Sequence, residues 1–212
     1  AGTPHVTIAR HYDPAAKLLT LVIRQHTPPT AGQAEKSPVP IPIRFGLLDR
    51  HGGAIALKSG PKDPGVPEQT LILTEAAQTL VFHDVAQDPV PSFLRGFSAP
   101  VVLDAGLSEA ELAHLAAHDC DPFGRWEALQ AIARSACLVG DTHPSALIAA
   151  LARALEQAQS DAAFTALLLR LPAWPELIQL RPDADPEALH RARAQVRHAV
   201  AVALCEPLDL VI

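Results

Sequence analysis

The stretch Val101-Val102-Leu103-Asp104-Ala105-Gly106-Leu107-Ser108-Glu109-Ala110-Glu111 decides how the chain is organised. Val101–Asp104 is a short aliphatic run of the kind that forms strands. After Gly106, the residues Ser108–Glu111 make a capping box. In this motif the serine oxygen accepts a free amide of the first helical turn, while the glutamate reaches back to the amide of the cap. A strand is therefore predicted to end, and a helix to begin, within eleven residues.

The composition changes at the same point. Residues 1–106 hold 13 of the 20 prolines and 9 of the 11 glycines. Residues 107–212 hold 25 alanines, against 13 in residues 1–106. The first half carries nine basic and nine acidic side chains. The second carries eight arginines, no lysine and fourteen acidic side chains, which accounts for the whole net charge of −6. These shifts predict two domains of different class, 1–105 and 106–212.

The first half has the pattern of strands separated by turns. In Lys17–Arg24 the set Leu19, Leu21 and Ile23 is apolar at every second position, as the inner face of a sandwich requires. Turn signals such as Gly52-Gly53 separate the apolar runs. Seven or eight short strands predict an immunoglobulin-like β-sandwich. The expected strands are Pro4–His11, Leu18–Gln25, Ile41–Leu48, Ala54–Lys58, Thr70–Leu73, Thr79–Val85 and Val101–Asp104, with Val90–Phe97 as a candidate eighth.

The second half has the periodicity of helices. Asp121-Pro122 and Asp185-Pro186 each place an N-cap before a proline at the first helical position. Apolar residues recur at helical spacing, and Gly140 is a stop signal. Ser160-Asp161 is expected to open a short helix that runs to Leu171. We expect an all-α domain of five or six helices of roughly 10–20 residues, packed closely through alanine, with no fixed repeat period.

The overall composition excludes several classes of protein. With 49% hydrophobic residues the chain can bury a core, so it is not disordered. No apolar run reaches the ~18 residues of a membrane span. The net charge of −6 argues against a nucleic-acid or anionic membrane surface as partner. Three widely spaced cysteines, Cys120, Cys137 and Cys205, exclude a disulfide scaffold and indicate a reducing, cytoplasmic location.

Two features predict that these residues are part of a longer protein. The sequence contains no methionine, and it stops within the apolar run Leu208–Ile212. Natural chain ends are usually polar and frayed. We therefore expect an internal excerpt.

Searches for catalytic motifs find neither H-E-x-x-H nor G-x-S-x-G, and neither a P-loop nor G-x-G-x-x-G. The one candidate metal pair is His114 and His118, which share a helix face where zinc could bind. The HLAAH sequence lacks the glutamate that would activate a water, so we expect the pair to be solvated. His190 and His198 are expected to be exposed polar positions. Cys137, within an apolar helical stripe, is expected to be a small core residue rather than a nucleophile.

Four segments, in their order and spacing, carry a family resemblance. They are QAEKSPVPIPIRFGLLD (Gln33–Asp49), TEAAQTLVFHDV (Thr74–Val85), DPVPSFLRGFSAPVVLD (Asp88–Asp104) and HDCDPFGRWEALQ (His118–Gln130). Together they resemble the region downstream of the catalytic domain in bacterial aminopeptidase N, a zinc-dependent alanyl aminopeptidase of the gluzincin family. The opening GTPHVTIARHYDP (Gly2–Pro14) resembles the first strand of its sandwich, and LLLRLPAWPELIQL (Leu167–Leu180) extends the similarity more weakly.

The resemblance implies a parent enzyme with an N-terminal β domain, a thermolysin-like catalytic domain, a small β-sandwich and a large helical C-terminal domain. The helical domain encloses the chamber that peptides enter. Zinc is held by two histidines of H-E-x-x-H and a distant glutamate, and a G-x-M-E-N-type loop binds the amino end of the substrate. This chain contains neither motif. We therefore assign no catalytic, cofactor-binding or metal-binding residue to it.

The resemblance predicts a non-catalytic portion of a zinc aminopeptidase that removes N-terminal amino acids from peptides. This portion would link to the catalytic domain of the same polypeptide, help enclose the active-site chamber and be inactive alone. Its expected partners are that domain and, for the parent enzyme, peptide substrates, with no nucleic acid and no membrane. Two alternatives stay open: a stand-alone protein-binding module, and a metal protein that uses His114 and His118.

Overall fold

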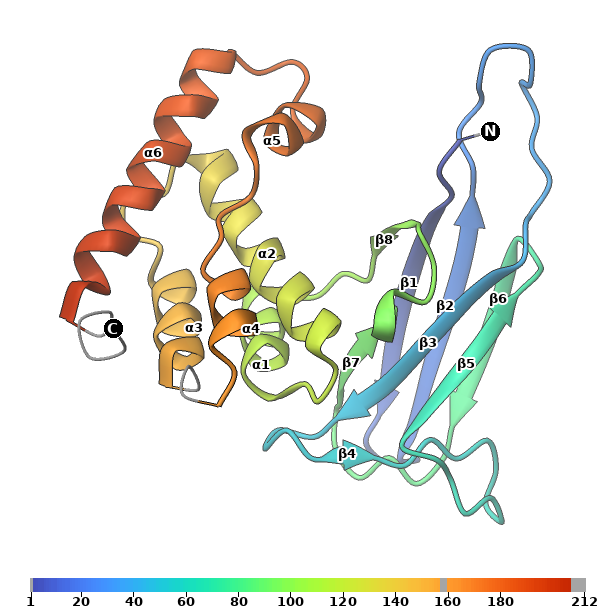
Figure 1. Cartoon of the computed structure of the whole chain (residues 1–212). Coiled ribbons are helices and arrows are strands. Elements are labelled where there is room, and N and C mark those ends of the chain that lie inside the picture. Colours follow the sequence, from blue (N-terminus) through green and yellow to red (C-terminus); the bar gives the residue numbers. More distant parts are fainter. Residues whose placement is uncertain (1, 157–159, 207–212) are drawn as a thin grey trace. The chain divides into compact units, whose positions relative to one another are not determined.

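The computed structural model describes residues 2–156 and 160–206, which form two compact units (Figure 1). The first unit comprises the residues up to Ser108 together with a short returning segment, His118–Gly124. The second comprises Glu109–Ala117 and the residues from Arg125 onward. The segment 118–124 thus follows the first helix in the chain but packs with the strands.

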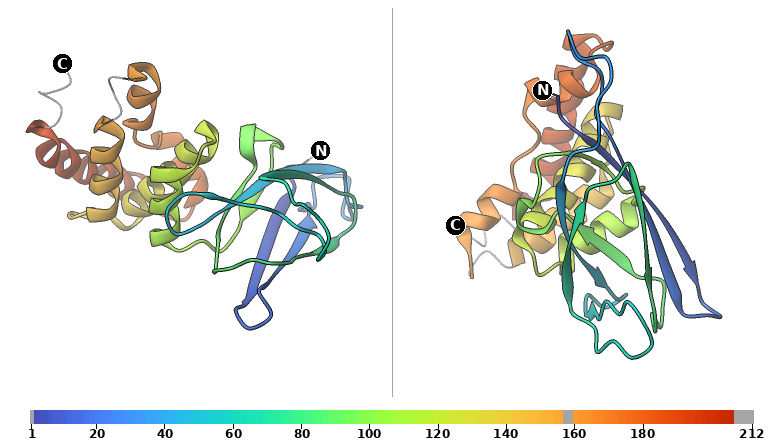
Figure 2. Two further views of the ribbon diagram at one scale, coloured as in Figure 1. Left: turned by 90° about the horizontal axis from the view of Figure 1, so that it is seen from below. Right: turned by 90° about the vertical axis from the view of Figure 1, so that its right-hand side faces the viewer.

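The first unit is a sandwich of two sheets, seen as separate layers in Figure 2. One sheet has the strand order β6-β2-β1-β8. The other has the order β4-β3-β5, with β7 also paired to β3. Strands β1 and β2 pair antiparallel from His5↔His26 to Asp13↔Leu18, whereas β1 and β8 are parallel. The strands are β1 (His5–Asp13), β2 (Leu18–His26), β3 (Ile41–Leu48), β4 (Ala54–Ile55), β5 (Glu68–Leu73), β6 (Ala77–Phe82), β7 (Val90–Phe93) and β8 (Val102–Asp104).

All eight expected strands are present, which confirms the sandwich, but four are shorter than predicted. Strand β6 ends at Phe82 rather than Val85, β8 begins one residue later than expected, and the other two differ more. The run Val90–Phe97 leaves the sheet after Phe93 and continues as a 3-10 turn, η1 (Arg95–Phe97). Leu94 and Gly96 have φ of 56° and 62°, and a strand does not continue through left-handed residues. The run Ala54–Lys58 pairs as a strand only over β4; beyond it, Leu57 makes an isolated bridge to Val66.

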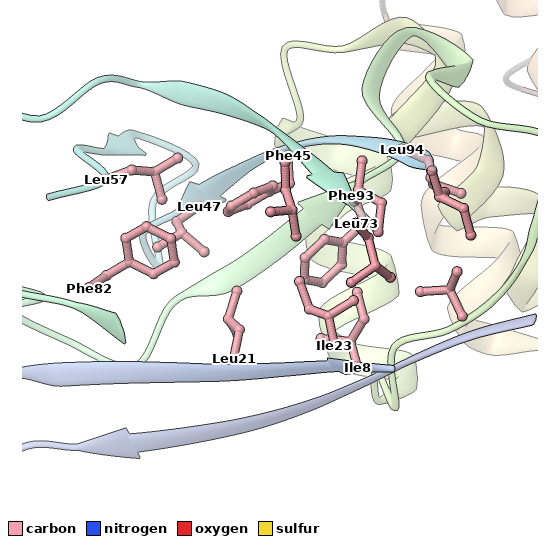
Figure 3. Packing of buried hydrophobic residues seen from close by; sticks show 14 of the residues in the cluster. Ile8, Leu21, Ile23, Phe45, Leu47, Leu57, Leu73, Phe82, Phe93 and Leu94 are labelled. Atoms are coloured by element: carbon pink, nitrogen blue, oxygen red, sulfur yellow. The ribbon is translucent and has the colours of Figure 1, made fainter. Parts of the chain in front are cut away.

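The core lies between the two sheets, as Figure 3 shows. Leu19, Leu21 and Ile23 of β2 are fully buried, which confirms the predicted inward set. From the other sheet, the Phe45 ring lies 5.9 Å from that of Phe82 and 5.8 Å from that of Phe93, between centroids. Apolar burial of this kind is the main favourable term in folding.

Gln25 occupies the next inward position of β2 and is buried although it is polar. Its side-chain nitrogen donates to the carbonyl oxygens of Val39 (2.9 Å), Leu73 (3.3 Å) and Glu75 (3.1 Å). Its side-chain oxygen accepts from the amide of Val39 at 3.0 Å. Since every polar atom of the side chain has a partner, Gln25 joins β2 to the segment that enters β3 and to the end of β5.

The described residues from Glu109 onward form six helices, within the number expected. Asp121 accepts from the amide of Gly124 at 2.7 Å, and Asp185 accepts from that of Glu187 at 3.0 Å, which confirms both predicted caps. None of the helices in the described ranges is long and apolar enough to cross a membrane. The helices are α1 (Glu109–His118), α2 (Pro122–Val139), α3 (Ser145–Glu156), α4 (Ala162–Leu168), α5 (Trp174–Leu180) and α6 (Pro186–Ala203).

Helix α4 ends at Leu168, three residues before the predicted end at Leu171. The predicted end was wrong: Leu169 is the C-cap, and Arg170 and Leu171 separate it from Pro172, which restricts only the residue directly before it. After this break α5 forms a separate helix of seven residues, with a proline in its first turn. This helix was not predicted.

Replacing Phe45 by alanine should lower the free energy of unfolding of the sandwich by about 3–5 kcal/mol, because it leaves a cavity between the rings of Phe82 and Phe93. The measurement is urea unfolding followed by circular dichroism. Both tryptophans, Trp126 and Trp174, belong to the second unit, so their emission follows that unit separately. The matched control is Ile72→Ala on the exposed face of β5, and an equal loss in both variants would contradict this account of the core.

Candidate functional site

The histidines that sequence analysis singled out lie on helices. His114 of α1 is half-buried and His118 at its end is exposed. The turn at Gly52 closely approaches His118, since a Cβ at Gly52 would lie 2.5 Å from the Cβ of His118. Among the described residues, no group of three or more His, Cys, Asp or Glu side chains is arranged to hold a metal ion. The described residues therefore do not fit a three-ligand zinc site; that the His114/His118 pair is solvated stays a prediction, with metal binding as the open alternative.

The other candidates have the environments expected for them. His190 and His198 on α6 are exposed. Cys137 on α2 is fully buried, which confirms it as a core residue. Burial raises the pKa of its thiol to about 11, so the reactive thiolate is disfavoured at neutral pH.

A buried polar cluster, which sequence analysis did not predict, lies in the first unit. We call Ser92, Arg95 and Asp119 the Arg95 cluster. The Nη2 of Arg95 lies 2.9 Å from Oδ1 of Asp119, and Nε of Arg95 donates to Oγ of Ser92 at 3.0 Å. The Ser92 hydroxyl in turn donates to Oδ2 of Asp119. The two charged side chains are 4% and 0% exposed, so this is a desolvated ion pair closed by a hydroxyl.

Local backbone geometry places Arg95 in this position. Strand β7 ends at Phe93, and the left-handed residues Leu94 and Gly96 turn the chain on either side of Arg95. A non-glycine residue with positive φ is uncommon and is held in place by its surroundings. In this turn the Arg95 side chain is directed into the protein rather than along the strand.

Two glycines leave room for the paired charges. A Cβ at Gly46 of β3 would lie 2.5 Å from Nη1 of Arg95. A Cβ at Gly124 of α2 would lie 2.4 Å from Oδ2 of Asp119. Any other residue at either position would displace a charged group from its partner, so the two glycines are part of the cluster's geometry.

The segment Asp119–Asp121, which we call the acidic turn, makes further bonds to the sandwich. Oδ1 of Asp119 accepts from the amide of Asp121 at 3.0 Å, which sets the shape of the turn. The carboxylate of Asp121 accepts from the amide of Gly96 at 3.0 and 3.2 Å and also caps α2 through Gly124. Asp121 therefore serves both η1 and the first turn of α2.

The ion-pair network continues outward along the second sheet. Oε2 of Glu68 on β5 lies 3.5 Å from Nη1 of Arg95. Oε1 of Glu68 accepts from Nε of Arg44 at 2.9 Å. The hydrogen bond from Arg44 holds the pKa of Glu68 below its usual range, and the same bond raises the pKa of Arg44. This outer pair is partly exposed, so its contribution to stability is small.

The arrangement of the cluster is structural rather than catalytic. A serine nucleophile needs a base that takes its proton and a path for the substrate. The Ser92 hydroxyl instead faces a carboxylate whose charge is already held by Arg95, and it is almost fully buried. The arrangement neutralises buried charges and holds the segment around Asp119 to the segment of Ser92 and Arg95.

The cluster joins two of the segments that carried the family resemblance and lies against a third. Gly46 lies in Gln33–Asp49, Ser92 and Arg95 lie in Asp88–Asp104, and Asp119 lies in His118–Gln130. The available signal was that each segment places a charged residue near a glycine in an otherwise apolar or turn sequence. The long-range pairing itself cannot be seen in a local pattern.

Comparison with known proteins identifies relatives over nearly the whole chain. A family of unknown function with an Ig-like fold, DUF3458, matches residues 2–106, and DUF3458_C, described as ARM repeats, matches residues 109–211. Aminopeptidase N of Escherichia coli K12 is 34% identical over 218 residues, which cover 98% of this chain and 25% of that protein. Aminopeptidase N of Caulobacter vibrioides is 40% identical over 210 residues, which cover 96% and 23%.

A solved structure agrees with these relatives. The crystal structure of Legionella pneumophila aminopeptidase A in complex with aspartic acid matches with a TM-score of 0.81 and 25% identity. The match covers 100% of this chain and 23% of that one. These findings confirm the resemblance to aminopeptidase N and the order of sandwich and helical domain. The chain spans about a quarter of the length of the curated relatives that it matches.

Arg95→Met should lower the free energy of unfolding by about 3–5 kcal/mol, because it leaves the Asp119 carboxylate buried without its cation. The double variant Arg95→Met/Asp119→Leu should recover at least half of this loss, since neither charge then remains unpaired. Urea unfolding of the unchanged chain, the single variants Arg95→Met and Asp119→Leu, and the double variant gives the coupling free energy between the two residues. The control is Arg191→Met on α6, whose ion pairs are exposed and whose loss should stay under ~1 kcal/mol. A double variant with purely additive losses would contradict the pairing.

The Glu68–Arg44 pair should make stability depend on acidic pH. Because the pKa of Glu68 is lower in the folded chain than in the unfolded chain, its stabilisation is present above the unfolded value. That stabilisation is lost as the pH falls through the folded value. Glu68→Gln should cost under ~1 kcal/mol at neutral pH, and the difference from the unchanged protein should disappear only as the pH falls through the lowered folded pKa of Glu68. Arg44→Gln should show the same dependence in urea unfolding across this range; a loss independent of pH would rule the pair out as its cause.

Proposed function

We propose that this chain, which matches the DUF3458 family over residues 2–106 and the DUF3458_C family over residues 109–211, is the non-catalytic part of a zinc metallo-aminopeptidase of the aminopeptidase N type. The observation that carries the proposal is that nearly the whole chain aligns, in one piece, with about a quarter of aminopeptidase N from two bacteria. The parent enzyme would remove N-terminal amino acids from peptides.

Within that parent, the role of this chain is architectural. It links to the catalytic domain of the same polypeptide and helps to enclose the active-site chamber. Two properties of the chain support this role: its sequence lacks H-E-x-x-H, and its described residues do not fit a three-ligand zinc site. The zinc would therefore be held elsewhere in the parent. The boundary between residues 105 and 106 stays a prediction.

A cytoplasmic location for the parent is part of the same proposal. Cys120, Cys137 and Cys205 all carry free thiols, and two of them are exposed. Exposed thiols persist in compartments that keep cysteine reduced. The free thiols therefore support a cytoplasmic location for the parent.

Hydrolysis of alanyl-p-nitroanilide, with and without added zinc, tests the proposed function. We expect activity in the full-length gene product and none in this chain alone, because the chain lacks the residues that bind and activate a water. A zinc chelator should abolish the activity of the full-length product. Hydrolysis by the isolated chain that depends on zinc would refute the proposal, and His114→Ala and His118→Ala would then be the first variants to make.

The stand-alone binding module is the alternative that the same comparison addresses. If the gene encodes only these 212 residues, no longer product exists, and the stand-alone binding module becomes the better-supported function. A peptidase-active full-length product that contains this chain would remove it.

A further inference from the structure

The acidic turn belongs to different parts of the molecule by sequence and by packing. It follows β8 by fifteen residues, comes after α1, and lies in the range that the helical DUF3458_C family matches. By its contacts, however, the segment His118–Gly124 is part of the sandwich unit. The sandwich unit therefore includes a segment that comes after its last strand and after α1 in the chain.

The surface that receives the turn is shaped and charged for it. We call Gly46, Ser92, Arg95 and Gly96 the socket. Arg95 offers a cation that is 4% exposed, and Gly96 offers a backbone amide. The two carboxylates of the acidic turn meet these two donors, Asp119 at Arg95 and Asp121 at Gly96. The charges and the hydrogen-bond roles are complementary on both sides.

Apolar packing and close approach add to the fit. The rings of Phe97 on η1 and Phe123, just after the turn, lie 5.2 Å apart between centroids. Phe123 also packs against the sandwich core. Gly124 lets Asp119 sit close to the start of α2, where a side chain would collide with it. The site thus combines a buried ion pair with an aromatic contact, as strong recognition sites do.

Without the turn, Arg95 would lose the Asp119 carboxylate and keep only Glu68, at 3.5 Å, among its ion-pair partners. Desolvating a charge is unfavourable unless a well-placed partner compensates it. The socket is therefore expected to be more stable when the acidic turn occupies it.

We propose that the socket is a recognition site for the acidic turn, and that it holds the turn even when the covalent link through residues 105–117 is cut. The first domain is then incomplete at residue 106, and its folding unit extends to Gly124. This inference concerns only the present chain and does not depend on its role in a peptidase.

The test inserts a specific protease site at Gly106 in the full chain. Gly106 is exposed and has open space around its Cα, so an insertion there leaves the packing intact. After complete cleavage, the two fragments should elute together in size-exclusion chromatography. Their dissociation constant is measured from the elution position over a dilution series.

Two variants examine the socket and the turn separately. Arg95→Met removes the cation, and Asp119→Asn removes the anion while keeping its size. Each should raise the dissociation constant at least tenfold. The matched control, Arg24→Met, removes one exposed positive charge from the outer face of β2 and should change the constant less than twofold. Circular dichroism before cleavage establishes that each variant is folded.

A peptide competition covers the case in which the variants do not fold. A synthetic peptide of residues 118–130 should promote dissociation of the cleaved, unsubstituted chain. The same peptide with both Asp119 and Asp121 replaced by asparagine should not. The proposal is overturned if the cleaved chain separates at once, if folded Arg95→Met and Asp119→Asn bind as tightly as Arg24→Met, or if the two peptides act equally.

Discussion

Arg95 and Asp119 are opposite charges, and burying either alone would be unfavourable. Several local features follow from this pairing. Gly46 and Gly124 are glycines because a side chain at either position would push a charge out of place. Leu94 takes a left-handed conformation that a strand would avoid, and the hydroxyl of Ser92 closes the third side of the pair. The segment 118–124 is thereby fixed to strands that precede it by many residues.

A second buried polar side chain of the sandwich, Gln25, also has all its polar atoms hydrogen-bonded. Gln25 fills an inward position of β2 and bonds the backbone of the segment before β3 and of the end of β5. Between these two polar links the core is apolar, with Phe45 at its centre (Figure 3). A sandwich held at two places by buried polar groups specifies one arrangement of its loops, which suits a part whose proposed role is architectural.

The fold could be predicted from sequence because it depends on local signals. Alternation in Lys17–Arg24 located β2, and aspartate–proline pairs located the starts of α2 and α6. Errors arose where the chain left a predicted element early, as at Leu94 after β7 and at Leu169 after α4. The Arg95 cluster was out of reach for a different reason. Its partners are 24 and 27 residues from Asp119, and no periodicity joins them. The family resemblance marked the right segments but assigned them no contact.

Native-state hydrogen exchange tests the central claim most directly, namely that the Arg95–Asp119 pair makes the segment 118–124 part of the sandwich. The informative amides are those of Gly96 and Asp121, which donate to carboxylates of the acidic turn. We predict that both exchange with the same opening free energy as the amides of Phe45 and Leu47 in β3, because all of them open only when the sandwich unfolds. Exchange of Gly96 and Asp121 well before the β3 amides would contradict the account.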